Sequence, residues 1–202
     1  IILAIVLLLN FSCTDWLDVK PVDRMSEDQL YSTEAGFRQA LNGIYVELNH
    51  ADLYGDELLV NTVEILAQRY KFSSMGTLTN QYHLAEFDYT TDYAKKCGSR
   101  IWEKAYALIA NVNKLLKNAD SHKDLFTGDS YDLITGEAYA LRAFLHFDLL
   151  RLFGPVYKTH KEDKSICYNT QFSLSGSDLL PASKVMEYVI ADLKEAEDRL
   201  AK

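Results

Sequence analysis

The most constraining feature of the sequence is the segment Gly136–Phe153, which has the pattern of one long helix with apolar residues over more than half of its circumference. A helix that is apolar on most sides is stable in water only when other elements cover it, so we expect this helix at the centre of the fold. Gly154 and Pro155 follow it, and proline cannot continue a helix. The segment therefore predicts a helical bundle organised around residues 136–153.

Apolar residues recur at intervals of three and four in several other segments, which indicates that amphipathic helices surround the central one. Small residues such as Ala105 and Ala143 would let neighbouring helices approach closely. No strong strand pattern is present, so we predict an all-α fold of tetratricopeptide-like helix pairs, with long loops over residues 72–93 and 156–181. The expected helices are a short one that begins at Ser26 and longer ones at about 37–48, 57–70, 99–118 and 182–200.

Individual side chains of the central helix lead to specific expectations about packing. Phe144 should be buried against the helix that carries Trp102. Glu137, Arg142 and Asp148 are charged residues within the same helix, and burying them unpaired would cost several kcal/mol. We therefore expect a paired, half-buried network between helices, with contact to a partner protein as the alternative.

The last helix has a clear division between an apolar and a polar face. Val189 and Leu193 lie on the predicted apolar face, whereas Asp192 lies on the predicted polar face with several Lys and Glu residues. We therefore expect the polar face, including Asp192, to be solvated.

The N-terminal residues indicate a secretory leader and a site of lipidation. Residues 1–9 form an unbroken apolar run that is too short to span a bilayer but fits the hydrophobic region of a signal peptide. Cys13 follows one small residue after this region, at the position of a bacterial lipoprotein cysteine. The predicted organisation is a truncated signal peptide over residues 1–12, a lipid tether over 13–25 and a helical domain over 26–202.

Two further cysteines, Cys97 and Cys167, have no spacing that defines a disulfide framework, a metal site or a redox motif. Disulfides are chemically allowed outside the cytoplasm, so the redox state of this pair is open. Two unrelated thiols are the simplest interpretation.

The sequence contains no signature of catalysis. The chain has 21 Lys and Arg against 29 Asp and Glu, a net charge of −8, and no basic cluster of the kind that binds nucleic acid. The zinc-protease motif, the glycine-rich phosphate loops and the serine nucleophile motif are all missing. We therefore predict no catalytic residues, no cofactor and no metal, and we interpret His146 as a hydrogen-bonded histidine of the core.

An aromatic-rich loop is the one ligand surface that the sequence suggests. Tyr82, Phe87, Tyr89 and Tyr93 are spread among polar residues between two predicted helices. Aromatic planes stack well against the C–H faces of sugar rings, so these four are candidate ligand-binding residues. The alternative is that they attach the loop to its own core.

Several segments together resemble the SusD/RagB family of nutrient-binding lipoproteins. The most specific is the central segment, with Gly-Glu-Ala at 136–138, Leu-Arg-Ala-Phe at 141–144 and Phe-Asp-Leu at 147–149. Weaker similarities, in the same order as in the family, are Leu17–Pro21, Gly43–Tyr45, Trp102–Asn113 and Val185–Leu200. Together these segments cover nearly all of the chain after Cys13.

The resemblance implies a surface lipoprotein, held at the cell outer membrane by its lipid anchor, that is not an enzyme. Such proteins bind glycan or peptide nutrients and deliver them to a SusC-like TonB-dependent outer-membrane transporter. Their N-terminal helical repeats form the scaffold and contact the transporter, whereas much of the ligand surface comes from a C-terminal half. Family members are well over twice as long as this chain. Residues 26–202 therefore resemble an N-terminal helical domain truncated at its C-terminal side, and a complete ligand site is not expected within it.

Two other classes of function are compatible with a helical chain. A secreted helical-repeat adaptor would bind proteins only, and it would need neither a lipid nor a transporter. An enzyme such as a glycosidase would need catalytic carboxylates, for which the sequence shows no motif. The nutrient itself is not identified by the sequence.

Overall fold

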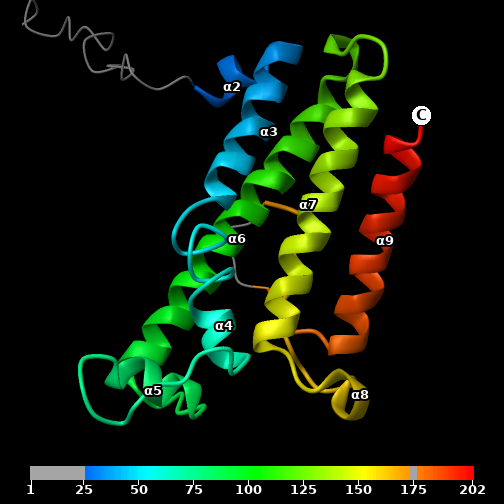
Figure 1. Ribbon diagram of the computed structural model, residues 1–202. Helices are drawn as coiled ribbons and strands as arrows, with labels where there is room; N and C mark the ends of the chain where they lie inside the picture. Colours follow the sequence, from blue (N-terminus) through cyan, green and yellow to red (C-terminus); the bar gives the residue numbers. More distant parts are fainter. Residues whose placement is uncertain (1–25, 173–176) are drawn as a thin grey trace, which may run out of the picture.

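The computed structural model describes residues 26–172 and 177–202, and these residues form a bundle of α-helices (Figure 1). No strand occurs within these two ranges, where the only β-type pairing is a single bridge between Lys164 and Pro181. The helices are α2 (Glu27–Leu30), α3 (Glu34–Leu48), α4 (Thr62–Leu66), α5 (Thr79–Ala85), α6 (Asp92–Ser121), α7 (Ser130–Phe153), α8 (Tyr157–His160) and α9 (Ala182–Leu200), with a 3-10 turn at Lys123–Leu125.

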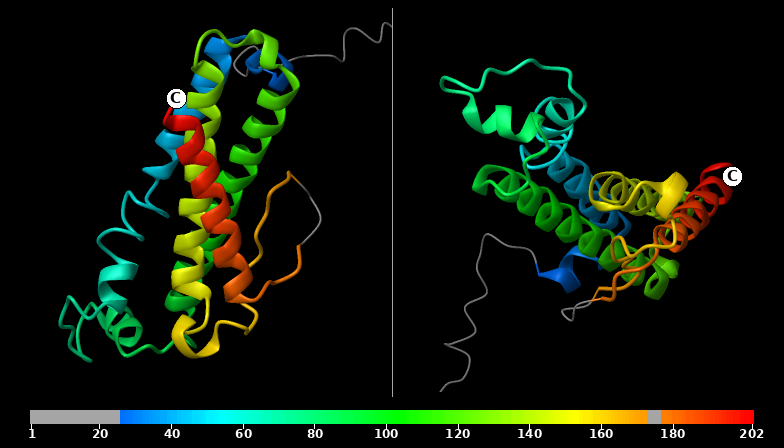
Figure 2. Two further views of the ribbon diagram at one scale, coloured as in Figure 1. Left: turned by 90° about the vertical axis from the view of Figure 1, so that its right-hand side faces the viewer. Right: turned by 90° about the horizontal axis from the view of Figure 1, so that it is seen from below.

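Four of these helices, α3, α6, α7 and α9, run side by side along the length of the molecule (Figure 1). The chain alternates in direction, so that α6 and α7 are antiparallel neighbours and α9 packs back along α7. Seen from below, α4 and α5 project from the side of the bundle opposite α9 (Figure 2). This arrangement confirms the predicted all-α fold of tetratricopeptide-like helix pairs.

Side-chain caps determine where several helices begin. Ser26 and Gln29 form the capping box that the sequence predicts, in which each side chain bonds to the other residue's backbone N–H. Thr33 caps α3, and Thr91 caps α6 by accepting the backbone N–H of Ala94. Because Thr91 provides this cap, α6 begins well before the predicted start at about residue 99.

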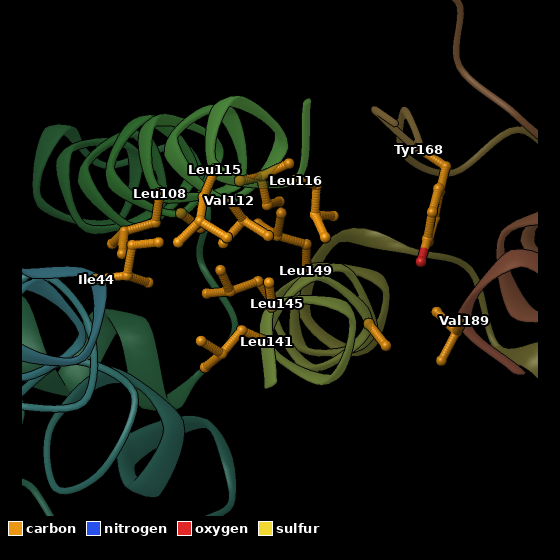
Figure 3. Close-up of a cluster of buried hydrophobic side chains, with 14 of the residues drawn as sticks. Ile44, Leu108, Val112, Leu115, Leu116, Leu141, Leu145, Leu149, Tyr168 and Val189 are labelled. Atoms are coloured by element: carbon orange, nitrogen blue, oxygen red, sulfur yellow. The ribbon is translucent and has the colours of Figure 1, made fainter. Parts of the chain in front are cut away.

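The main core lies between α3, α6, α7 and α9. Figure 3 shows leucines of α7 facing residues of α3 and α6, while Val189 and Tyr168 lie on the opposite side of α7. Gly136 allows α9 to approach α7 closely, because a Cβ atom at this position would lie 2.8 Å from Cγ of Leu200. The labelled core residues are Ile44, Leu108, Val112, Leu115, Leu116, Leu141, Leu145, Leu149, Tyr168 and Val189.

The predicted helix over residues 57–70 is wrong for most of its length. Only Thr62–Leu66 is α-helical, and residues 51–60 form consecutive turns. The reason is a polar contact: the buried carboxylate of Glu57 accepts the Thr62 hydroxyl and pairs with Arg100 on α6. The region predicted as a loop, 72–93, contains the short helix α5.

The prediction for Phe144 is also wrong. Its side chain is 44% exposed and stacks on Tyr54, with the ring centroids 5.1 Å apart, instead of packing against the helix of Trp102. Phe144 lies with Leu133 and Phe147 on an outer stripe of α7 that none of the described elements covers completely. A helix that is apolar on most sides does not reveal which of its sides faces the core.

The most buried ion pair among the described residues joins Arg142 of α7 to Asp192 of α9. The guanidinium donates from Nε and Nη2 to the two carboxylate oxygens, each at 2.7 Å, and both side chains are buried. Tyr168 donates its hydroxyl to the same carboxylate at 2.6 Å, and Arg142 also donates to the Asn113 side chain of α6 at 2.9 Å. Asp192 therefore faces the interior, which corrects the prediction of a solvated polar face.

The other two charged residues for which the sequence predicts partners, Glu137 and Asp148, are also hydrogen-bonded. Glu137 accepts the hydroxyl of Tyr45 on α3, and Asp148 accepts the hydroxyl of Tyr54 at 2.7 Å. Each bond links α7 to another part of the chain. The predicted pairing is therefore present, but as three separate contacts and not as one network between helices.

His146 is a completely buried, neutral histidine, as its place in the apolar helix predicts. Its Nε2 accepts the backbone N–H of Asn169 at 3.0 Å, so Nδ1 carries the proton and donates it to the carbonyl of Arg142 at 2.8 Å. The ring also stacks on Tyr168, with centroids 3.9 Å apart. Burial lowers the pKa of His146 to about 4, because desolvation disfavours the charged imidazolium.

We predict that Asp192→Ala destabilises the protein by about 3–5 kcal/mol, because it leaves the guanidinium of Arg142 buried without its carboxylate partner. Urea denaturation measures this change in the free energy of unfolding. Glu187→Ala on the same helix is the matched control: it removes an exposed ion pair with Lys184 and should change stability by less than about 1 kcal/mol. Equal effects of the two substitutions would contradict the central role of the buried pair.

We also predict a loss of stability in acid that depends on His146. The pKa of this group is about 4 when folded and near its ordinary value of 6.5 when unfolded, so the unfolded chain takes up a proton first as the pH falls. Between pH 7 and pH 5 this linkage should remove about 2 kcal/mol of stability. His146→Gln should have a smaller loss over the same interval, measured by urea denaturation at both pH values. Parallel pH profiles for the two proteins would show that His146 is not responsible.

Candidate functional site

A cleft of about 570 Å³ opens between the α4–α5 region and the ends of α6 and α7 that lie next to it. Leu66 and Leu84 line it from α4 and α5, Trp102 lines it from α6, and Leu152 and Phe153 line it from the end of α7. The two sides belong to different hydrophobic clusters, because Leu84 packs in a small cluster of its own, separate from the main core. The cleft is thus the space between the bundle and a smaller projecting lobe.

Trp102 is held in a fixed orientation on the bundle side of the cleft. Its ring meets Phe153 edge to face, with centroids 5.2 Å apart, and lies tilted against Tyr106 at 4.8 Å. Tyr106 is fixed in turn, since its hydroxyl donates to the carbonyl of Cys167 at 2.8 Å. A partly buried indole that is fixed in this way can offer a flat aromatic surface to a ligand.

A second, more polar hollow of about 330 Å³ adjoins the first. Leu66, Tyr89 and Leu152 line both spaces, and Asp148 and Arg151 line the second one only. The two hollows therefore adjoin at Tyr89; the first is mainly apolar, and the second carries the charged side chains of Asp148 and Arg151.

The charged end has a defined hydrogen-bond arrangement. Arg151 donates to Oδ1 of Asp148 at 2.7 Å, and the hydroxyl of Tyr54 donates to Oδ2 at 2.7 Å. Burial and the bond to Asp148 raise the pKa of Tyr54, so its hydroxyl keeps its proton and remains a donor. Asp148 therefore uses both carboxylate oxygens as acceptors within the protein, while Arg151 is exposed enough to reach a ligand.

The edge of the apolar hollow carries polar groups that face solvent. Lys95, Ser99 and Glu103 line the cleft from successive turns of α6. Neither Lys95 nor Glu103 forms an ion pair with another residue of the described ranges. An aromatic surface bordered by available donors and acceptors is typical of sites for small polar ligands.

The structure brings one of the four predicted aromatic residues into the cleft. Tyr89 lines both hollows and is 57% exposed, and Phe87 is 52% exposed but lines neither. Tyr82 lies on α5 with its ring edge to face with His83, and Tyr93 packs against the small cluster of the lobe. Tyr93 thus follows the alternative prediction, because it attaches the loop to a hydrophobic core and does not line the cleft.

Sequence reasoning did not identify Trp102, Lys95, Glu103 or Arg151 as residues of a possible site. Trp102 falls in the repeating apolar positions of α6, so it is expected in the core. The three charged residues have the pattern of ordinary solvent-exposed positions on a helix. Nothing in their spacing along the chain signals that the end of α7 meets the start of α6. Only the packing of the two helices brings them together.

Cys13 lies outside the described residues. Cys97 and Cys167 are free thiols, and burial raises the pKa of both. In the ranges that the structure describes, no three His, Cys, Asp or Glu residues are grouped so that they could hold a metal ion. The same ranges contain no helix with the length and apolar character needed to cross a membrane.

A family of proteins named SusD-like, and described as starch-binding and associating with the outer membrane, matches residues 15–201. SusD-like protein P2 of Formosa agariphila is 28% identical over 199 residues, which are 97% of this chain but 37% of that protein. SusD-like protein P25 of the same organism is 27% identical over 148 residues, or 71% of this chain and 28% of that protein. The chain thus spans about a third of the length of these curated relatives.

Solved structures share the fold at low sequence identity. A SusD superfamily protein from Bacteroides fragilis superposes with a TM-score of 0.68 at 18% identity, over 82% of this chain and 39% of its own. A SusD-like carbohydrate-binding protein from Bacteroides vulgatus superposes with a TM-score of 0.67 at 22% identity, over 82% and 35%. These likenesses concern the fold of the helical region.

Proposed function

The chain belongs to the SusD-like family, and we propose that it is the helical part of an outer-membrane lipoprotein that binds a glycan and delivers it to a TonB-dependent transporter. The single observation that supports binding in this part of the protein is the cleft around Tyr89, where Trp102 and charged side chains meet. The family's description as starch-binding and associating with the outer membrane agrees with this proposal.

The chemistry of the cleft suits a sugar. Pyranose rings have C–H faces that pack on aromatic planes and hydroxyl edges that need both donors and acceptors. Tyr89 and Trp102 offer the planes, while Lys95 and Glu103 offer a donor and an acceptor at the edge. The lining charges of the two hollows balance, with Lys95 and Arg151 against Glu103 and Asp148, which favours an uncharged sugar.

We propose binding rather than catalysis at this site. Glycoside hydrolysis needs two carboxyl groups, one of them free to donate a proton. Asp148 accepts hydrogen bonds from Tyr54 and Arg151 on its two oxygens, and Glu103 lines only the other hollow. A paired acid and base facing one substrate bond is therefore not formed by these two residues.

Binding at the cleft predicts that Tyr89→Ala weakens the affinity for maltoheptaose, a soluble starch fragment, by roughly three- to tenfold, because one stacking contact is lost. Isothermal titration calorimetry measures the dissociation constants. Tyr157→Ala, which removes a similarly exposed tyrosine from α8, is the matched control and should leave affinity unchanged. Binding that Tyr89→Ala does not alter would place the glycan elsewhere.

Membrane attachment is proposed through Cys13, which follows the predicted signal region of residues 1–12 at the start of the tether 13–25. An acylated cysteine buries many methylene groups, each worth about 0.8 kcal/mol, and more than one chain gives a stable anchor. The transporter partner is proposed from family membership alone. Co-purification of the protein with a TonB-dependent transporter from its native membrane would test it.

We predict that Cys13→Ala, expressed from the natural gene in the native host, moves the protein from the membrane fraction to the soluble fraction. Metabolic labelling with a clickable fatty acid should mark the wild-type protein and not the variant. Cys97→Ala is the matched control and should keep the label, because Cys97 is buried inside the folded domain. Equal labelling of the wild type and Cys13→Ala would refute lipidation at this cysteine.

A further inference from the structure

Phe87 has a backbone conformation that large side chains rarely adopt. Its φ is 58°, in the left-handed region, where Cβ comes too close to the neighbouring carbonyl oxygen. Among the described residues other than glycine, Gln68 (φ 59°) is the one other example.

The cause is the way in which α5 ends. The N–H of Phe87 bonds to the carbonyl of Leu84 at 3.0 Å, and the N–H of Asp88 bonds to the carbonyl of His83 at 2.9 Å. This pair of bonds is a Schellman motif, and Phe87 occupies the position where glycine is usual. Gln68 has the same position after α4, with its N–H on Ile65 and the N–H of Arg69 on Glu64.

The two residues differ in what their side chains do. The amide of Gln68 donates to the carbonyl of Ala85 at 2.6 Å, so it joins α4 to α5 and has a structural role. Phe87 is 52% exposed, and its side chain has no aromatic partner among the described residues. Phe87 thus combines a strained backbone with a large apolar side chain that belongs to neither hydrophobic cluster, and this combination is typical of residues kept for function.

The loop that carries Phe87 is held by several hydrogen bonds. Oδ1 of Asp88 accepts the backbone N–H of Thr90 at 3.0 Å and its hydroxyl at 2.6 Å, and these bonds, that of the hydroxyl first, lower the pKa of Asp88. The hydroxyl of Thr91 donates to the carbonyl of Asp88 and caps α6. Phe87 and Tyr89 are therefore presented by a preorganised loop, which reduces the ordering cost of binding.

We propose that Phe87 is a second sugar-stacking residue, outside the cleft, for an uncharged oligosaccharide long enough to extend beyond Tyr89. This rests on the proposed glycan binding at the cleft. Phe87 stands two residues before Tyr89, so their Cα atoms are at most about 7 Å apart, and one loop carries the exposed Phe87 and the aromatic residue that lines both hollows. The residue selects for the length of the ligand, because a short sugar held in the cleft does not reach it.

The test compares maltotriose with maltoheptaose for the wild type and Phe87→Gly by isothermal titration calorimetry. The wild type should bind maltoheptaose more tightly. Phe87→Gly should lose roughly three- to tenfold in affinity for maltoheptaose and keep its affinity for maltotriose. Because glycine relieves the backbone strain, the melting temperature of Phe87→Gly should equal that of the wild type or exceed it by roughly 2–4 °C. Phe87→Tyr should retain the preference for the longer sugar.

Gln68→Gly is the matched control, since it also introduces glycine, at the same position of the other Schellman motif. It removes the bond between α4 and α5, so any effect on the lobe should alter both affinities alike and leave the preference for maltoheptaose unchanged. If the wild type binds both sugars and Phe87→Gly keeps the full preference for maltoheptaose, the role of Phe87 is refuted while glycan binding stands. If Phe87→Gly lowers the melting temperature by several degrees, the ring supports the fold and the proposal also fails. If the wild type binds neither sugar, the proposed function and this inference fail together.

Discussion

The buried ion pair between Arg142 and Asp192 is the contact on which the rest of the bundle depends. It joins α7 to α9, and through Asn113 it also reaches α6. Tyr168 adds the connecting segment before α9 to the same network. Each member satisfies a polar group of another, so the apolar surfaces of three helices can close around charges that would be costly if unpaired. The close approach of α9 to α7 and the position of the connecting segment both follow from this arrangement.

The cleft depends on a different property of the fold, the division of the apolar residues into two clusters. The main core keeps α3, α6, α7 and α9 together, whereas Ile65, Leu84, Ala85 and Ala94 form a small core within the lobe. The polar contact of Glu57 with Arg100 and Thr62 holds the start of this lobe against α6. Because the two clusters do not merge, a hollow remains between them, and Trp102 and Tyr89 both line it. Hydrophobic packing thus holds the bundle together, and the cleft exists because the main core and the small core of the lobe remain separate.

Two exposed phenylalanines, Phe87 and Phe144, differ in whether their backbone is strained. Phe87 keeps a strained backbone with its ring in solvent, although a glycine would fit the end of α5 better. Phe144 and its neighbours on the outer stripe of α7 are exposed as well, but on regular helix backbone that carries no strain. Exposure alone is common for apolar residues in folded proteins, whereas exposure combined with strain is not.

The sequence by itself determined the helical class, the central position of residues 136–153, the capping box at Ser26, the paired charges of α7 and the buried neutral state of His146. These follow from local periodicity, cap chemistry and the cost of burying charge, all of which are encoded over a few residues. Only the tertiary structure decided that Asp192 faces inward, that Phe144 faces outward and that residues 51–60 form turns. It also decided that Trp102 and Arg151 lie beside Tyr89. The physical reason is that periodicity marks the sides of a helix but not the partner that each side meets. The partners here belong to different elements of the chain, and Arg142 and Asp192 are 50 residues apart.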